Sequence, residues 1–513
     1  MNPTNKSTNV FEFKENIVQL IIDELKEAEN FINIAVFQIH NKEIFNTLEN
    51  KLNNGVKVDI FTLPYDSIND DIRNDVIPLF ENLKNKGAIL HFCKWNIGDP
   101  ERTTTAIGRW YLFHGKFIVT DKSAMVLSAN LMQEEELDAA IIFRDDMNKI
   151  NEYNKKFHEL IELFVKENNK ENIKAKIGNS GLLNGEIIKL FELPKSIETN
   201  THKNFWIHHY PVSIFSNKPN ILEGLHITPF DYKGREVLKL LIDEAEKFIY
   251  ISTESFTDPE FPEYLIRKSL NNNNIEIKLL SGASSMDFPD RIQKMILELL
   301  ACNIKIKTYK NIHAKFIVTD KHIAISSINL NKINLGFAPY NNKFWRENTE
   351  TIAIYNNNEL LEEGKIKFND NFDRFSDIKE TLINKYKTII KDKFSLFDLR
   401  TREDVKELFA RLIIQKKIEI EEFILYITKI TSKIIIYLNN NSRLVTKKYF
   451  ILSLILYYLT ERKYDIDQLN EKLSILKIDM GTINDSLKVL LDNDFIEKDN
   501  DFYKINLNKL FKY

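Results

Sequence analysis

The chain has 513 residues and a formal net charge of −3, with 43% hydrophobic and 28% charged residues. This length predicts two to four domains, and the ordinary composition argues against a disordered or fibrous chain. The near-neutral charge excludes a bulk electrostatic attraction to nucleic acid or to an anionic membrane, so an anionic partner is expected to bind at a local patch.

The positions of the cysteines and the lengths of the apolar runs predict the cellular compartment of the protein. Cys93 and Cys302 have no metal-like spacing, so neither a disulfide framework nor a zinc site is predicted. The first 13 residues are polar and do not predict a secretory signal. The longest apolar run, residues 449–459, is about half as long as a bilayer crossing requires. We therefore expect a cytoplasmic protein that does not act at a membrane.

Helical and strand patterns alternate along the first part of the chain. Residues 15–29 have the apolar spacing of an amphipathic helix, and residues 31–37 follow as a buried strand. A helix, a strand, a helix and a strand are then expected at residues 42–52, 56–63, 75–84 and 88–93. This alternation predicts an α/β fold whose sheet is largely parallel and carries helices on its faces.

The same order of elements begins again after residue 230. Helices are expected at residues 234–247, 262–270 and 291–300, and strands at residues 248–252, 275–280 and 304–309. Residues 137–143 and 349–355 predict the strands that close the two halves. Asp138 and Glu350 fall at corresponding places in them.

An octapeptide that begins at His114 returns almost unchanged at His313. The two copies read His-Gly-Lys-Phe-Ile-Val-Thr-Asp and His-Ala-Lys-Phe-Ile-Val-Thr-Asp. Each copy is followed, at equal distance, by Ser-x-Asn, with Ser128 and Asn130 in the first half and Ser327 and Asn329 in the second. Agreement of this kind indicates an internal duplication of whole domains.

The repeated residues suit chemistry on phosphorus. Side chains alternate along a strand, so a histidine and a lysine two residues apart share one face. If two such faces met, they would gather two imidazoles, two ammonium groups and two asparagine amides. One histidine could attack phosphorus while the other protonates the leaving oxygen, and the lysines and asparagines could hold the remaining oxygens.

These motifs resemble those of the phospholipase D superfamily, whose signature is His-x-Lys-x(4)-Asp followed by Gly-Ser-x-Asn. Both copies fit the first part, whereas Leu127-Ser128-Ala129-Asn130 and Ser326-Ser327-Ile328-Asn329 lack the usual glycine. The resemblance covers about residues 15–375. It implies two pseudo-twofold-related lobes with mixed, largely parallel sheets, one site between them, a covalent phosphohistidine intermediate and no metal or other cofactor.

The resemblance also implies roles for individual residues. His114 would be the nucleophile and His313 the general acid and then the base, although this order could be reversed. The remaining residues would bind phosphate (Lys116, Lys315, Asn130 and Asn329, supported by Ser128 and Ser327), fix the histidine tautomers (Asp138 and Glu350) or hold the motif strands (Asp121 and Asp320).

Irregular segments beside the motifs are candidates for substrate selection. The first half has a surplus at residues 96–112, which contains Arg102, Arg109 and Trp110, and the second half has one between Asn329 and Glu350. We expect the three residues named in the first surplus to contact substrate.

The chain after the second lobe is predicted to be helical. Its last part has the order of a winged helix, with three helices at residues 449–460, 466–473 and 482–493 and a small two-stranded turn. The expected domains are a first lobe (1–165), a connector (166–230), a second lobe (231–378), a helical linker (379–445) and a winged-helix-like domain (446–513).

The motifs leave the substrate open. A winged helix often docks on duplex DNA, which favours a nuclease acting on DNA or RNA; a restriction or phage-defence role is suggested by analogy only. The expected recognition helix has one cation, Lys488, beside Asp485 and Asp492, so the domain could instead bind a protein partner or form a dimer. The alternatives are a cytosolic phospholipase or transphosphatidylase acting on lipid headgroups, and a nucleic-acid-binding regulator with an idle site.

Overall fold

The computed structural model describes most of the two lobes and of the C-terminal region. The described residues are 9–65, 68, 70–92, 94–96, 108–132, 136–164, 187–189, 213–215, 223–228, 231, 234–258, 261–272, 274–282, 290–331, 334–335, 338–341, 344–378, 420–442, 447–493 and 495–506. Most of the predicted connector and residues 379–419 lie outside them. The predicted domain boundaries therefore stay predictions.

The chain divides into two compact units. The first unit consists of Met1–Phe261, Asn274–Met286 and Lys307–Ser376, and it contains both copies of the repeated motif. The second unit consists of Pro262–Asn273, Asp287–Ile306 and Asp377–Tyr513.

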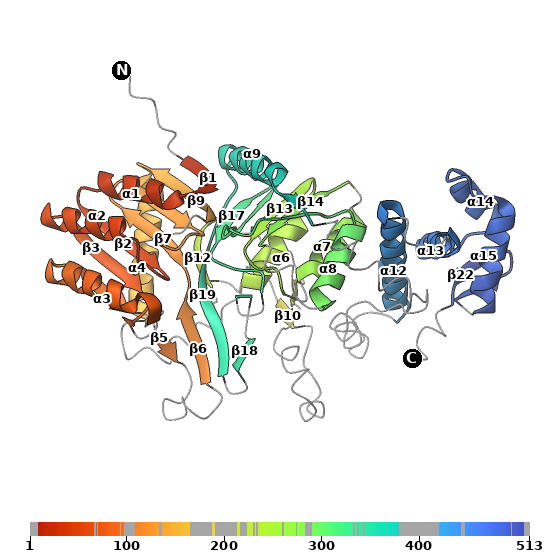
Figure 1. Cartoon of the computed structure of the whole chain (residues 1–513), viewed down its shortest axis with the longest axis horizontal. Helices are drawn as coiled ribbons and strands as arrows, with labels where there is room; N and C mark the ends of the chain where they lie inside the picture. Colours follow the sequence, from red (N-terminus) through yellow and green to blue (C-terminus); the bar gives the residue numbers. More distant parts are fainter. Residues whose placement is uncertain are drawn as a thin grey trace, which may run out of the picture. The chain divides into compact units, whose positions relative to one another are not determined.

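The first lobe is built on a seven-stranded sheet with the order β1-β9-β8-β7-β2-β3-β4. It is drawn in red and orange in Figure 1. Its strands are β1 (Asn9–Glu15), β2 (Phe31–Val36), β3 (Lys57–Thr62), β4 (Ile89–Phe92), β7 (Lys116–Thr120), β8 (Ser123–Leu127) and β9 (Leu137–Arg144). Strands β2, β3 and β4 are parallel, whereas β7, β8, β9 and β1 join by antiparallel pairs.

The second lobe repeats this plan. Its sheet has the order β20-β15-β14-β13-β16-β17-β19-β6-β5, with β12 and β18 also paired to β19. In Figure 1 the strands of this lobe are drawn from yellow-green to teal, whereas β6 and β5 are orange. The strands of this lobe are β12 (Gly224–Thr228), β13 (Phe248–Thr253), β14 (Glu276–Ser281), β15 (Lys305–Thr308), β16 (Phe316–Thr319), β17 (Ile323–Ser326), β18 (Ala338–Asn341), β19 (Phe344–Tyr355) and β20 (Ser376–Asp377). Strands β5 (Lys94–Asn96) and β6 (Gly108–Phe113) come from the first lobe, so one sheet contains strands of both halves. The expected α/β fold with two lobes and mixed sheets is confirmed.

Helices connect the strands, and their caps explain where several begin. The helices of the lobes are α1 (Ile17–Glu27), α2 (Lys42–Asn53), α3 (Asp70–Asn85), α4 (Met147–Phe164), α6 (Gly234–Glu244), α7 (Phe261–Asn271), α8 (Asp290–Ala301) and α9 (Asn358–Arg374). Asn41 caps α2 by accepting bonds from the backbone N–H groups of Glu43 and Ile44, and Asn357 caps α9 in the same way. A short hairpin of β10 (Ile187–Lys189) and β11 (Ser213–Phe215) lies between the lobes in sequence.

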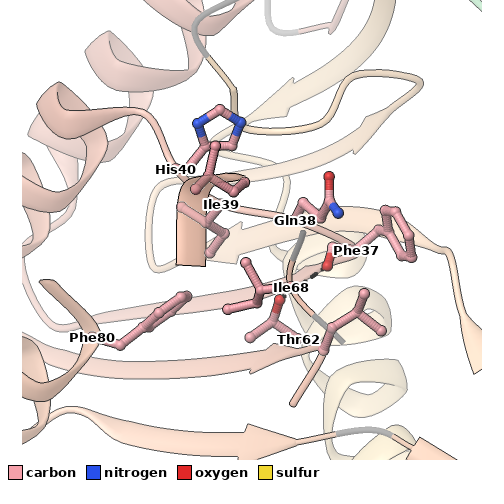
Figure 2. A pocket seen from close by; sticks show the side chains of 9 residues that line it. Phe37, Gln38, Ile39, His40, Thr62, Ile68 and Phe80 are labelled. Carbon is pink, nitrogen blue, oxygen red and sulfur yellow. Dashed lines mark hydrogen bonds between the residues drawn. The ribbon is translucent and has the colours of Figure 1, made fainter. Parts of the chain in front are cut away.

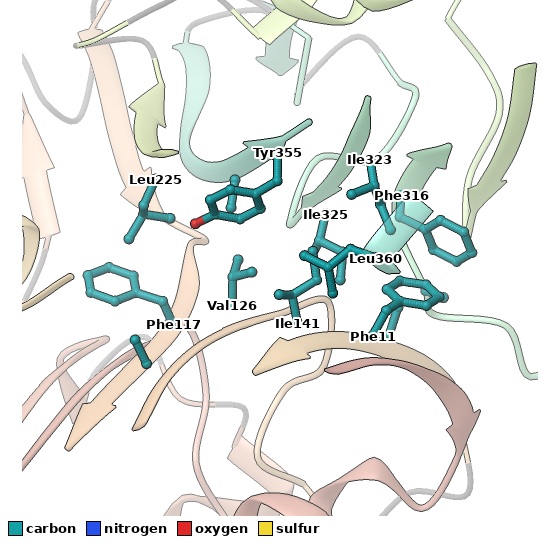
Figure 3. Packing of buried hydrophobic residues seen from close by; sticks show 14 of the residues in the cluster. Phe11, Phe117, Val126, Ile141, Leu225, Phe316, Ile323, Ile325, Tyr355 and Leu360 are labelled. Atoms are coloured by element: carbon teal, nitrogen blue, oxygen red, sulfur yellow. The ribbon is translucent and has the colours of Figure 1, made fainter. Parts of the chain in front are cut away.

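A hydrophobic core joins the two lobes. Phe11 and Ile141 of the first lobe are fully buried in one cluster with Phe316, Ile325 and Leu360 of the second, as Figure 3 shows. The rings of Phe11 and Phe316 meet edge to face, with centroids 5.2 Å apart. Burying a large apolar side chain contributes about 1.5–3 kcal/mol, so this shared core holds the two motif strands in a fixed relation.

The C-terminal region is helical. Helix α12 (Ile420–Ser442) is followed by α13 (Lys447–Leu459), α14 (Ile466–Ser474), α15 (Met480–Asp492) and the antiparallel strands β21 (Ile496–Asp499) and β22 (Phe502–Ile505). Asp465 and Gln468 form a capping box at the start of α14. Three helices and a hairpin occur in the expected order, and the assignment to the winged-helix class stays a prediction. Within the described chain, every helix is too short or too polar to cross a membrane.

Candidate active site

His114 is held by the second lobe. It lies in the short link between β6 and β7, and its backbone N–H donates to the carbonyl oxygen of Thr349 at 2.7 Å. Its Nδ1 lies 2.8 Å from Oε2 of Glu350, a fully buried residue of β19. Two consecutive residues of one strand therefore fix both the backbone and the ring of this histidine.

His313 is held by the first lobe in the same way. Its backbone N–H donates to the carbonyl oxygen of Leu137 at 3.0 Å, and its Nδ1 lies 2.9 Å from Oδ1 of Asp138. Oε2 of Glu136 lies 3.6 Å from the same nitrogen. The two histidine and carboxylate pairs are thus exchanged between the lobes, which brings both predicted histidines and both predicted carboxylates to one interface.

The two motif serines hold these carboxylates. Ser128 Oγ donates to Asp138 Oδ1 at 2.7 Å, and Ser327 Oγ donates to Glu350 Oε2 at 2.5 Å. Asn334 Nδ2 donates to the other oxygen of Glu350. Because every carboxylate oxygen described here faces a fixed donor or a histidine, the imidazole rings have little freedom to turn.

The two motif lysines are buried at the same interface. Lys116 Nζ donates to the carbonyl oxygen of His114 at 2.9 Å and lies 3.4 Å from His114 Nε2. Lys315 Nζ donates to the carbonyl oxygen of His313 at 2.6 Å. Burial, and then the positive charge of Lys315, lower the pKa of Lys116 to about 7. The ammonium groups of the two halves therefore act on each other electrostatically.

Burial and charge set the protonation of the first pair. Burial is the main cause that lowers the pKa of His114 to about 4, and the charge of Lys116 adds to it against the opposing effect of Glu350. Burial tends to raise the pKa of Glu350, but the hydrogen bond from His114 and the charge of Lys116 outweigh it and lower that pKa. At neutral pH the site holds a neutral imidazole on an ionised carboxylate.

Both motif asparagines have a buried amide oxygen without a hydrogen-bond partner. The Oδ1 atoms of Asn130 and Asn329 are buried and lack a hydrogen-bond partner, whereas Asn329 Nδ2 donates to Oε2 of Glu254 at 3.0 Å. Buried polar groups are nearly always bonded in native proteins. The two halves thus share a buried amide oxygen at the same place in the motif; this oxygen only accepts hydrogen bonds, so a phosphate oxygen would have to bind the amide nitrogen instead.

Phe37 and Glu254 also belong to the site, and the sequence analysis missed them. The ring centroid of Phe37 lies 4.7 Å from that of His114, and Lys116 Nζ lies 5.7 Å from the Phe37 centroid. Glu254 Oε2 lies 3.0 Å from Lys315 Nζ and 3.7 Å from His313 Nε2. Each residue directly follows an early strand of its lobe, and a repeat alignment extended to those strands would have paired them.

A small, mainly apolar pocket adjoins Phe37. Figure 2 shows it between the segment after β2 and the residues around α3, with Ile39, Thr62, Ile68 and Phe80 on its walls. Phe37 belongs both to this pocket and to the surroundings of His114. The Phe37 ring therefore contacts both the His114 imidazole and the apolar pocket.

The motif aspartates lie away from the histidines. Asp121 Oδ1 accepts bonds from the backbone N–H groups of Glu29 and Asn30 at 3.0 and 3.1 Å. Asp320 Oδ1 accepts equivalent bonds from Glu246 and Lys247 at 2.8 and 3.0 Å. Each aspartate ties the end of a motif strand to the turn before β2 or β13.

The side chains of the three residues expected to contact substrate lie outside the described part of the chain. Arg102 lies outside the described residues, and so do the side chains of Arg109 and Trp110 in β6. Among the described residues, Glu136, Asp138 and His313 offer three ligand atoms within 4.8 Å of one another. Asp138 already holds His313 Nδ1 at 2.9 Å, so this group is accounted for by the pairing of histidine and carboxylate.

The chain belongs to the phospholipase D-like family. The model of the family described as "Cardiolipin synthase, PLD-like domain" matches residues 21–161 and again residues 238–372, which together are more than half of the chain. The two matches coincide with the two lobes and contain one histidine of the site each. The resemblance expected from the motifs is thereby confirmed, and membership indicates phosphodiesterase or phosphotransferase chemistry.

Three solved structures are similar to parts of this chain. A phosphatidylserine synthase from Haemophilus influenzae Rd KW20 matches with 13% identity and a TM-score of 0.44, over 79% of this chain and 93% of its own. A polyphosphate kinase from Porphyromonas gingivalis matches with 12% identity and a TM-score of 0.40, over 70% of this chain and 50% of its own. The phospholipase D family member Nuc from Salmonella typhimurium matches with 19% identity and a TM-score of 0.25, over 30% of this chain and 95% of its own.

This chain spans about half the length of the polyphosphate kinase. No curated protein matches the chain.

Proposed function

We propose that the chain is a metal-independent phosphodiesterase that cleaves nucleic acid through a covalent phosphohistidine. The observation that carries this proposal is the exchanged pairing of His114 with Glu350 and of His313 with Asp138, 2.8 and 2.9 Å apart. Each pair leaves the Nε2 atom of its ring directed away from the carboxylate. Two such rings with two buried lysines suit a single phosphorus between them.

The surroundings of the two Nε2 atoms support different roles. His114 Nε2 faces the ammonium group of Lys116 at 3.4 Å, which favours a lone pair rather than a proton on this nitrogen. His313 is then left as the proton donor, and its Nε2 lies 3.7 Å from the carboxylate of Glu254 in the free protein. His114 is therefore the nucleophile and His313 the general acid.

The reaction then has two balanced steps. His114 Nε2 forms a bond to phosphorus while the bond to the leaving oxygen breaks, and His313 gives its Nε2 proton to that oxygen. A water molecule next attacks the phosphohistidine and gives a proton to His313, which frees His114 and releases the second product. Lys116, Lys315 and the two motif asparagines hold the remaining phosphate oxygens in both steps.

The C-terminal region supports nucleic acid as the substrate. Helices α13, α14 and α15 followed by the hairpin of β21 and β22 have the order of elements found in winged helices. Domains of this kind place a helix against duplex DNA. The same region also suits a protein partner or a second copy of this chain, and these are outcomes of the binding measurements rather than separate proposals.

Parallel turnover assays test the proposal. The purified chain is incubated with single-stranded DNA, duplex DNA, RNA and phosphatidylcholine vesicles, each with and without EDTA. We expect cleavage of nucleic acid that persists in EDTA and is lost in His114→Ala and in His313→Ala. Turnover of vesicles alone would assign the site to lipid headgroups, and binding without turnover would favour a regulator. A single-histidine variant with a rate near that of the wild type would contradict the mechanism.

A further inference from the structure

Each lobe supplies one half-site, which contains the histidine and the lysine of its motif. The two half-sites differ at one structurally equivalent position. In the first lobe, Ile32 of β2 pairs with Thr120, and in the second lobe Ile249 of β13 pairs with Thr319, the equivalent residue of the second motif. Counting five residues onward along each strand leads to Phe37 and to Glu254. The same place in the fold thus carries an aromatic ring in one half and a carboxylate in the other.

The carboxylate of Glu254 gathers three donors of its half-site. Its Oε2 lies 3.0 Å from Lys315 Nζ, accepts a bond from Asn329 Nδ2 at 3.0 Å and lies 3.7 Å from His313 Nε2. In the proposed mechanism Lys315 and Asn329 hold phosphate oxygens, and His313 protonates the leaving oxygen. A carboxylate oxygen resembles a phosphate oxygen in charge and in hydrogen bonding.

The place between Lys315, Asn329 and His313 is called the anion seat of the second half-site. We infer that the carboxylate of Glu254 occupies this seat in the free protein and must leave it before a phosphate group can bind. This inference rests on the proposed function for the identity of the ligand as a phosphate group. The first half-site differs because Phe37 has no charge and accepts no such bonds. In the free protein the second seat is therefore closed by the protein's own carboxylate, whereas the equivalent residue of the first half-site is the uncharged Phe37.

Exposure and charge agree with a displaceable side chain. The side chain of Glu254 is 44% exposed, whereas those of Lys315 and Asp138 are 0% and 6% exposed. Burial tends to raise the pKa of Glu254, but the charges of Lys315 and His313 outweigh it, so the group is ionised. Because an ion pair and a hydrogen bond hold this carboxylate, a ligand that also binds elsewhere on the protein displaces it more readily, which favours a substrate anchored along its length over a small free phosphate.

The test measures binding of inorganic phosphate by calorimetry, which needs no turnover. Glu254→Gln should bind phosphate at least about tenfold more tightly than the wild type, a difference of about 1.4 kcal/mol. Glutamine retains the shape and an oxygen for Asn329, and Glu254→Ala is a second variant that removes the competing group altogether. Adding Lys315→Met to Glu254→Gln should abolish the gain, which localises it to this seat.

Glu136→Gln is the matched control. Glu136 lies 3.6 Å from the other nitrogen of His313, so the control removes an equal charge near the same ring without vacating the seat. We expect less than about a threefold change for this variant. An unchanged or weaker affinity in both Glu254 variants would overturn the inference, and so would equal gains in Glu254→Gln and Glu136→Gln.

The two proposals fail separately. If Glu254→Gln gains affinity for phosphate and no nucleic acid is cleaved, the inference about the seat is supported while the proposed substrate is wrong. If nucleic acid is cleaved and neither Glu254 variant gains affinity, the proposed function is supported and the seat is wrong.

Discussion

His114 and Glu350 are 236 residues apart in sequence, yet Nδ1 of the first lies 2.8 Å from Oε2 of the second. His313 and Asp138 repeat this relationship in the opposite direction at 2.9 Å. Neither lobe can complete its own histidine pair, because each carboxylate belongs to the other lobe. The duplication therefore makes one site that requires both halves rather than two independent sites.

This exchange predicts strong effects of single amide substitutions. Glu350→Gln and Asp138→Asn should each lower kcat by at least about 100-fold, because the amide no longer favours the required histidine tautomer or a positive charge on the ring. Steady-state kinetics on the cleaved substrate measure the change. Glu363→Gln is the control, since Glu363 also bridges the lobes, by accepting a bond from Phe11 N–H at 2.8 Å, but does so away from the histidines. Equal rates in Glu350→Gln and the control would contradict the assigned role.

The two octapeptides differ only at Gly115 and Ala314, and we expect exchanges at these two positions to have unequal effects. A Cβ at Gly115 would lie 2.6 Å from Thr351 Cγ2 and 2.8 Å from Phe113 Cε2. Gly115→Ala should therefore destabilise the protein by about 1–3 kcal/mol and displace His114, with a loss of activity. The reverse change in the second motif, Ala314→Gly, removes only a methyl group and should cost about 1 kcal/mol.

Urea unfolding and activity assays of both variants compare these effects. Thr351→Ser removes the nearest clashing atom and keeps the hydroxyl that accepts a bond from Lys116 N–H at 3.0 Å, so Gly115→Ala with Thr351→Ser should recover part of the lost stability. Equal losses in Gly115→Ala and Ala314→Gly would show that the close approach is unimportant.

We expect kcat/KM to fall as the pH rises through neutrality. Lys116 has a pKa of about 7, so it is charged below this pH and loses its proton as the pH rises through it. His114 has a pKa of about 4 and is neutral above that value. The free enzyme should therefore be most active between about pH 4 and 7, because only there is the nucleophile neutral while the lysine is charged.

Lys116→Arg tests the assignment of the alkaline limit. Arginine stays protonated in proteins, so the decline of kcat/KM should move to higher pH in this variant, even if its rate at neutral pH is lower. A decline that stays at the same pH in Lys116→Arg would show that another group is responsible.

The motif aspartates should affect stability rather than chemistry. Asp121 accepts two backbone bonds near 3 Å from the turn before β2, and Asp320 does the same before β13. Asp121→Ala and Asp320→Ala should each lower the free energy of unfolding by about 1–3 kcal/mol. At a temperature well below the unfolding transition, their rates should stay within about twofold of the wild type. A large loss of rate in a fully folded variant would place these aspartates in the chemistry instead.

Local patterns identified most elements of the two lobes. The helix expected at residues 42–52 is α2 at Lys42–Asn53, and the strand expected at residues 248–252 is β13 at Phe248–Thr253. Periodicity is a local property, so these elements could be read from neighbouring residues. The strand β1 at Asn9–Glu15 was missed, because its partner is β9, whose residues lie more than 120 positions later.

The sequence by itself determined the duplication, the family and the chemical groups of the site, because the motifs are contiguous and recur at equal spacing. Only the tertiary structure decided which carboxylate holds which histidine, since that pairing depends on how β19 and β9 cross between the lobes. It also decided the difference between Phe37 and Glu254, which lie outside the motifs and reach the site only because β2 and β13 pack beside the motif strands. These contacts join segments that are far apart in sequence, and they form only when the segments pack together, so no single stretch of the sequence specifies them.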